Sequence, residues 1–184
     1  MDTTFPTEYE CDQLMELPNG PMPHFYYPDS NGGGADGLLV MVRPKLAQTW
    51  IGTFAFGRVT PKGVSGIYST PNPRRVCVVA NGSGYLVSTN VPKIWESIWA
   101  TPITDVRPIR AQGIIVFATF TDLVAYDGDN VKWRTKRLTW SDMKIVEATD
   151  SHIKGEYWDI RIDRTGTFVV DLRTGAHEGG IEAF

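Results

Sequence analysis

Residues 113–133 read GIIVFATFTDLVAYDGDNVKW and decide the fold class of this 184-residue chain. Two apolar runs, Ile114–Phe120 and Leu123–Tyr126, are separated by two polar residues, and a turn at Asp127–Asn130 leads into a third run. Short runs that are rich in Val, Ile, Phe and Tyr and bounded by turn residues predict consecutive antiparallel strands. The stretch therefore predicts a β-meander.

The same pattern recurs through the rest of the sequence, and no window has the 3.6-residue period of a major helix. Trp95 and Trp133 lie 38 residues apart, and Tyr85 and Tyr126 lie 41 apart. A period near 40 with several strands in each unit is typical of the blades of a β-propeller. We expect an all-β domain over 37–184, built as an antiparallel meander of three blade-like units.

Residues 113–133 resemble one repeat of the quinoprotein-like (PQQ-type) β-propellers. In that repeat a glycine begins an apolar strand, a second strand ends near an aspartate, and a glycine turn precedes a tryptophan. Gly113, Gly128 and Trp133 match these positions, whereas Thr121-Asp122 replaces the usual glycine of the first hairpin turn. The resemblance implies a propeller-like fold. No residue matches that family's cofactor site, and we expect no cofactor.

The number of repeats leaves the topology open. A closed propeller typically needs four or more blades, and residues 37–184 supply three to three and a half units of about 40 residues. We therefore expect a partial propeller or one completed across an oligomer, with a β-sandwich or a barrel as the alternative.

The beginning of the chain differs in composition from the rest. Residues 1–42 hold seven acidic side chains and no Lys or Arg, whereas the remaining sequence holds 18 Lys and Arg and 14 acidic residues. Five prolines and the Asn31–Gly34 loop interrupt regular structure there. We expect residues 1–36 to form an irregular, acidic, Pro/Gly-rich arm. It is either solvated or docked on the basic body of its own or a neighbouring subunit.

The residues that could carry chemistry do not form a recognisable motif. The three histidines have no metal-ligand spacing, and Cys11 and Cys77 form no CxxC pair, so we expect no metal and assign no catalytic residue. Glu156 and Asp159 lie near His152 and two aromatic residues, which is a composition found in sugar sites. A small β-scaffold hydrolase or carbohydrate-active protein is therefore one alternative, and it requires these three side chains to converge in a pocket.

Aromatic and basic side chains are the candidates for binding. Lys132, Arg134 and Lys136 share one face of an expected strand, and tryptophan is enriched at binding hot spots. The sequence pI of about 5.6 argues against nucleic acid as a partner. The candidate binding residues are Trp99, Trp133, Arg134, Lys136, Phe25 and Tyr26.

These observations favour a non-catalytic binding or interaction protein. A protein partner or self-association is the expected mode, a small-molecule or sugar ligand stays open, and a homo-oligomeric assembly component is a further alternative. No apolar run reaches the ~18 residues of a membrane helix, and the first residues lack the parts of a secretory signal. We therefore expect a cytoplasmic protein without membrane contact.

Overall fold

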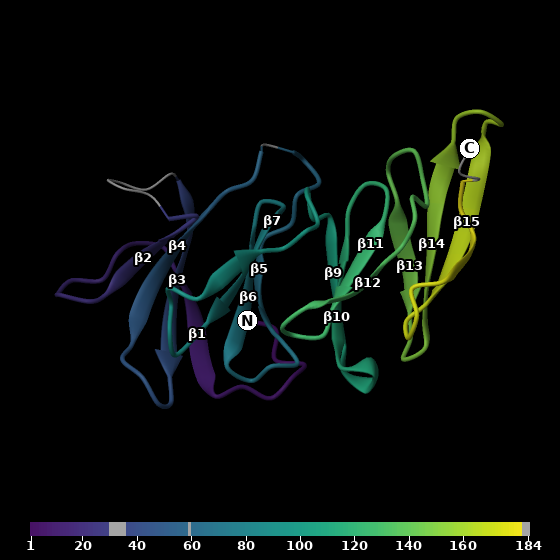
Figure 1. The fold of residues 1–184 in the computed structure, drawn as a ribbon. Coiled ribbons are helices and arrows are strands. Elements are labelled where there is room, and N and C mark those ends of the chain that lie inside the picture. Colours follow the sequence, from purple (N-terminus) through teal and green to yellow (C-terminus); the bar gives the residue numbers. More distant parts are fainter. Residues whose placement is uncertain (30–35, 59, 182–184) are drawn as a thin grey trace.

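The computed structural model describes residues 1–29, 36–58 and 60–181 of the chain. In this part of the chain every regular element is a β-strand except one 3-10 turn, η1, at Arg110–Gln112. The strands form four sheets of four strands each, and the sheets follow one another along the sequence. Figure 1 shows them as blades standing side by side, from the purple first blade to the yellow-green fourth. The all-β, propeller-like architecture is therefore confirmed.

The blades share a simple topology. The second, third and fourth are antiparallel meanders, whereas in the first blade β2 is added in parallel beside β4. The strands of the first blade are, in sheet order, β1 (Tyr9–Leu14), β3 (Gly37–Pro44), β4 (Trp50–Ala55) and β2 (His24–Tyr27). Those of the second are β5 (Gly66–Ser69), β6 (Arg75–Ala80), β7 (Ser83–Ser88) and β8 (Trp95–Ser97). The third contains β9 (Asp105–Ile109), β10 (Ile114–Ala118), β11 (Leu123–Tyr126) and β12 (Val131–Arg134), and the fourth contains β13 (Lys144–Ala148), β14 (His152–Asp159), β15 (Arg164–Asp171) and β16 (His177–Gly179).

The hydrophobic core lies between the blades. Three clusters of buried side chains fill the three junctions between neighbouring sheets, and among the described residues no cluster joins the first blade to the fourth. All five residues of β10 are buried because Ile115 and Phe117 belong to the second junction while Ile114 and Val116 belong to the third. A sheet that is covered on both faces needs a continuous apolar run rather than an alternating one.

Two strands of the first blade come from the segment expected to be irregular. In β1, buried Tyr9 and Cys11 alternate with exposed Glu10 and Asp12, which is the pattern of a half-buried strand. In β2, Tyr27 is buried. The conformation of residues 1–29 thus differs from the expected arm, because these apolar anchors find partners in β3 and β4. The expected boundary at residue 36 stays a prediction, and the Asn31–Gly34 loop lies outside the described residues.

The repeat seen in the sequence corresponds to equivalent strands. Trp95 lies in the fourth strand of the second blade and Trp133 in the fourth strand of the third. Tyr85 and Tyr126 lie in the corresponding third strands. Four blades are present instead of the three expected units, because β3 and β4 are completed by β1 and β2.

Candidate binding groove

A groove of about 920 Å³ lies where the outer strand of the third blade approaches the end of the fourth. We call it the basic groove. Among the described residues that line it, every ionisable side chain is a lysine, an arginine or a histidine, and none is a carboxylate. Such a surface attracts anions. Its lining residues are Arg134, Lys136, Arg137, Thr174, Gly175, Ala176, His177, Gly179, Gly180 and Ile181.

One wall of the basic groove rests on Trp133. The indole is buried, and its Nε1 donates a hydrogen bond to the carbonyl oxygen of Leu172 at 2.8 Å. The turn that follows passes directly over the ring at Gly175, where φ is +73° and an added Cβ would lie 2.8 Å from the indole. Only glycine accepts both this backbone angle and this close approach. The turn is therefore fixed against the core of the third junction.

The same turn is closed by Asp171. Its carboxylate accepts hydrogen bonds from the backbone nitrogen of Thr174 at 2.9 Å and from the Thr174 hydroxyl at 2.7 Å. These bonds favour the ionised carboxylate and hold the pKa of Asp171 below its usual range. The position of the wall is thus set by a turn whose polar groups are satisfied.

Arg134 is held by a buried carboxylate. Asp122 is 5% exposed and accepts hydrogen bonds from the hydroxyls of Thr119 and Thr121 and from Nε of Arg134. Asp122 lies in the turn between β10 and β11. The carboxylate ties this turn to β12 and orients the guanidinium of Arg134 at the groove.

Lys136 and Arg137 supply the charge that is not balanced locally. Lys136 is exposed and takes part in none of the hydrogen bonds or ion pairs found in the described part of the chain. Arg137 donates to the carbonyl oxygen of Thr139 at 3.1 Å. Its guanidinium carbon also lies 5.2 Å from the centroid of the Trp140 ring, within the range of a cation–π contact.

The basic groove continues into an exposed aromatic surface. The guanidinium carbon of Arg161 lies 5.8 Å from the centroid of the same Trp140 ring. Ile160 and Ile162, on either side of Arg161 in the β14–β15 turn, are 76% and 53% exposed. We call these residues the Trp140 patch: Arg137, Trp140, Ile160, Arg161 and Ile162.

The structure brings together some of the expected binding residues. Arg134 and Lys136 line the basic groove, and Trp133 lies beneath it as a buried support. Trp99 is 74% exposed after β8 and does not line the groove.

The two aromatic candidates of β2 lie in the first blade. Phe25 packs edge-on against Trp50, with ring centroids 5.8 Å apart. Tyr26 stacks on His24 at 4.5 Å. Neither residue lines the basic groove.

Sequence reasoning missed Arg137 as a groove residue, together with His177 and the turn glycines. A signal for Arg137 was present, because residues 131–141 contain four basic and no acidic side chains. His177 and Gly175 carried no such signal, since they reach the groove through the packing of the fourth blade against the third.

The three residues of the hydrolase alternative do not converge. Glu156 is exposed on one face of β14, whereas Asp159 is buried on the other. Hydrogen bonds from Arg161 lower the pKa of Asp159, and a general acid needs a raised pKa. His152 faces Glu147, with 3.5 Å between Nε2 and Oε1. This arrangement counts against a carboxylate-based hydrolase site here.

The described residues contain no group of three or more His, Cys, Asp or Glu that could hold a metal ion. In the same part of the chain, no helix is long and apolar enough to cross a membrane.

No family model and no curated protein matches the chain. One similar solved structure is the N-terminal domain of Nup159, with 13% identity, a TM-score of 0.45, and coverage of 98% of this chain and 52% of that one. A second is a complex of an S. cerevisiae Dbp5 variant with Nup159, a Gle1 variant, IP6 and ADP, with 12% identity, a TM-score of 0.44, and coverage of 95% and 50%. The chain thus spans about half the length of the chains it matches, and likenesses of this size carry no argument about its site or partners.

Proposed function

We propose that this protein is a non-catalytic interaction module whose basic groove holds an acidic segment of a partner protein. The observation that carries the proposal is the charge of the groove. Among the described residues that line it, Arg134, Lys136, Arg137 and His177 are the ionisable ones and none is a carboxylate, in a chain whose formal net charge is −3. The groove is thus a local concentration of positive charge on an otherwise acidic protein.

The distribution of charge favours a short anionic segment over a long polyanion. A nucleic acid that extended past the groove would meet the excess of acidic residues elsewhere on the protein. A peptide with a few carboxylates fits within the groove and leaves those surfaces free. Because Asp122 already neutralises part of the charge of Arg134, Lys136 and Arg137 are the main contacts.

The test is binding of a fluorescein-labelled hexaglutamate peptide, followed by fluorescence anisotropy at low and at physiological salt. We expect binding that weakens with salt, because the contacts are exposed ion pairs. Lys136→Glu reverses one charge in the groove and should weaken binding by about tenfold or more, which corresponds to about 1.4 kcal/mol. Lys136 is exposed, so the variant retains its packing.

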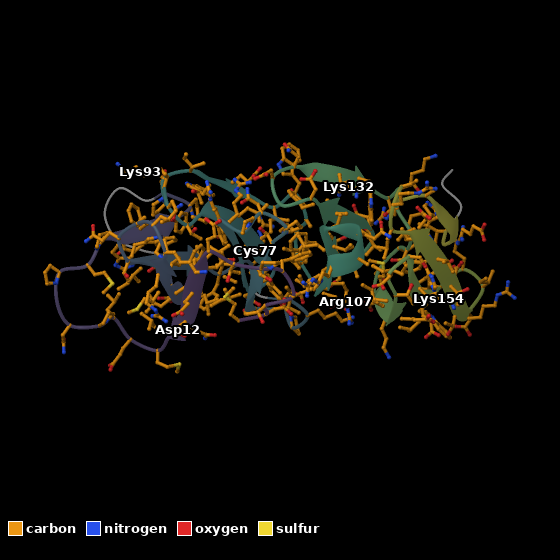
Figure 2. All side chains as sticks on the ribbon, turned by 90° about the horizontal axis from the view of Figure 1, so that it is seen from below. Asp12, Cys77, Lys93, Arg107, Lys132 and Lys154 are labelled. Carbon is orange, nitrogen blue, oxygen red and sulfur yellow. The ribbon has the colours of Figure 1, made fainter. Side chains whose placement is uncertain are left out.

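The matched control is Lys93→Glu, which makes the same change in net charge at an exposed lysine away from the groove. Figure 2 shows Lys93 toward the opposite end of the molecule from the fourth blade. The proposal requires native affinity in this control. Equal losses in the two variants, or no binding of the peptide at low salt, would refute it.

The remaining expectations stay predictions. They are the quinoprotein-like character of the repeat, a small-molecule or sugar ligand, binding roles for Trp99, Phe25 and Tyr26, and a cytoplasmic location. The proposal depends on none of them.

A further inference from the structure

An exposed acidic and apolar loop connects β1 to β2. We call residues 15–19 the acidic loop. Met15 is 93% exposed and Leu17 is 53% exposed, and Glu16 lies between them. Asp12 precedes the loop and is paired with Arg43, whereas Glu16 has no ion-pair partner among the described residues. The loop therefore presents two large apolar side chains in solvent, one on either side of the Glu16 carboxylate.

The opposite end of the molecule carries the complementary surface. The basic groove supplies Lys136 and Arg137, and the Trp140 patch adds exposed apolar side chains beside a second guanidinium. Trp140 is 38% exposed and Ile160 is 76% exposed. A methionine side chain is flexible and packs well on aromatic rings, so Met15 suits the Trp140 ring. The carboxylate of Glu16 suits the free ammonium of Lys136.

The two surfaces are placed so that they cannot meet within one molecule. In Figure 1 the β1–β2 connection lies at one end of the row of blades and β14 and β15 lie at the other. Figure 2 shows the same separation from below, with Asp12 toward one end and Lys154 toward the other. The second and third blades stand between them. Only another molecule can bring an acidic loop to this groove.

We infer that a second copy of this chain inserts its acidic loop into the basic groove and against the Trp140 patch, head to tail. The inference rests on the proposed function, and it names the partner. The two surfaces are different, so the interface is heterologous, and copies joined in this way form a ring or an open series.

The first experiment measures the mass of the 184-residue chain by light scattering and sedimentation from low to tens of micromolar concentration. We expect association that rises with concentration and falls with salt. Glu16→Lys alters only the acidic loop and Lys136→Glu alters only the basic groove, and each variant should be monomeric by itself. Asp150→Lys, at an exposed acidic residue outside both surfaces, is the control that should associate like the native chain.

The decisive experiment mixes the two monomeric variants in equal amounts. Glu16→Lys retains a native groove and Lys136→Glu retains a native acidic loop. A head-to-tail interface can therefore form between the two variants, and the mixture should contain dimers. If instead each loop met the loop of its partner, or each groove met the groove, one of the two single variants would still associate before mixing. Failure of the mixture to associate, when the native chain does associate, overturns the inference.

The outcome can be separated from that of the proposed function. If the native chain stays monomeric at tens of micromolar but binds hexaglutamate through Lys136, the inference that a second copy is the partner is wrong. The proposal that the groove binds an acidic segment is then still supported. If Lys136→Glu associates as strongly as the native chain, the inferred contact between copies is also wrong. Loss of hexaglutamate binding and of self-association together in Lys136→Glu supports both.

Discussion

Replacing Asp122 by alanine tests whether one buried carboxylate holds the turn of the third blade and the first arginine of the groove. The substitution removes the acceptor for the hydroxyls of Thr119 and Thr121 and for Nε of Arg134. The backbone at this position needs no glycine, because Asp122 does not have a positive φ. The change therefore isolates the contribution of the side chain.

The three contacts differ in strength. The buried hydrogen bond from Thr119 to the carboxylate contributes about 1.5–3 kcal/mol, and the one from Thr121, at 3.2 Å, adds about 0.5–1 kcal/mol. The side chain of Arg134 is 52% exposed, so its ion pair is screened by solvent and adds less than about 1 kcal/mol. We expect Asp122→Ala to lower the free energy of unfolding by about 2–5 kcal/mol.

The assay is urea unfolding followed by tryptophan fluorescence, with the midpoint and the slope fitted together. A lower midpoint at an unchanged slope reports a loss of stability without a change in the surface exposed on unfolding. Asp150→Ala removes an exposed carboxylate and serves as the control, with an expected change within about 0.5 kcal/mol. A loss in Asp122→Ala no larger than in the control would refute the role given to this carboxylate.

Three further predictions follow from the packing. Gly175→Ala places a Cβ against the ring of Trp133 at a residue with a positive φ. It should lower the free energy of unfolding, measured with urea, by about 1–3 kcal/mol, and it should weaken hexaglutamate binding. Gly113→Ala also has a positive φ but no atom within 4 Å, so it should cost only about 1 kcal/mol, and equal losses would contradict the proposed clash. Burial lowers the pKa of His24, so the folded protein binds fewer protons there than the unfolded chain and loses stability as pH falls below about 6.5. His24→Gln should reduce this dependence of the free energy of unfolding on pH. An unchanged dependence in the variant would exclude His24 as its source. A chain that begins at Gly37 lacks β1 and β2 and should unfold at lower urea than the full chain, whereas equal midpoints would support an independent domain from that residue.

Much of the fold could be predicted because the blades are local. Each meander in the second to fourth blades pairs strands that are adjacent in sequence, so the runs and turns around Tyr126 and Asp127 were sufficient. The first blade was missed for the opposite reason. In it β1 pairs with β3 across 22 residues that contain four prolines, and β2 pairs in parallel with β4. Pairings of this kind leave no hairpin signal.

The candidate site could be predicted only in part. The alternation of Lys132, Trp133 and Arg134 correctly places a buried indole between exposed cations. The groove itself forms where two blades meet, and the residues that complete it from the fourth blade are about 40 positions further along the chain. The packing of Gly175 on Trp133 and the hydrogen bond from the backbone nitrogen of Ile181 to the carbonyl oxygen of Leu138 bring them together.

The three separate core clusters make the blades behave as a linear series of coupled units. Each junction depends on its two neighbouring sheets alone, so the total stability is close to a sum of sheet and junction contributions. The end sheets have one junction each, while the second and third have two. Fluctuations should therefore begin at the ends, which are the two places that carry the acidic loop and the Trp140 patch. Contact between copies would supply each end with the neighbour it lacks, so that association and resistance to local unfolding would rise together.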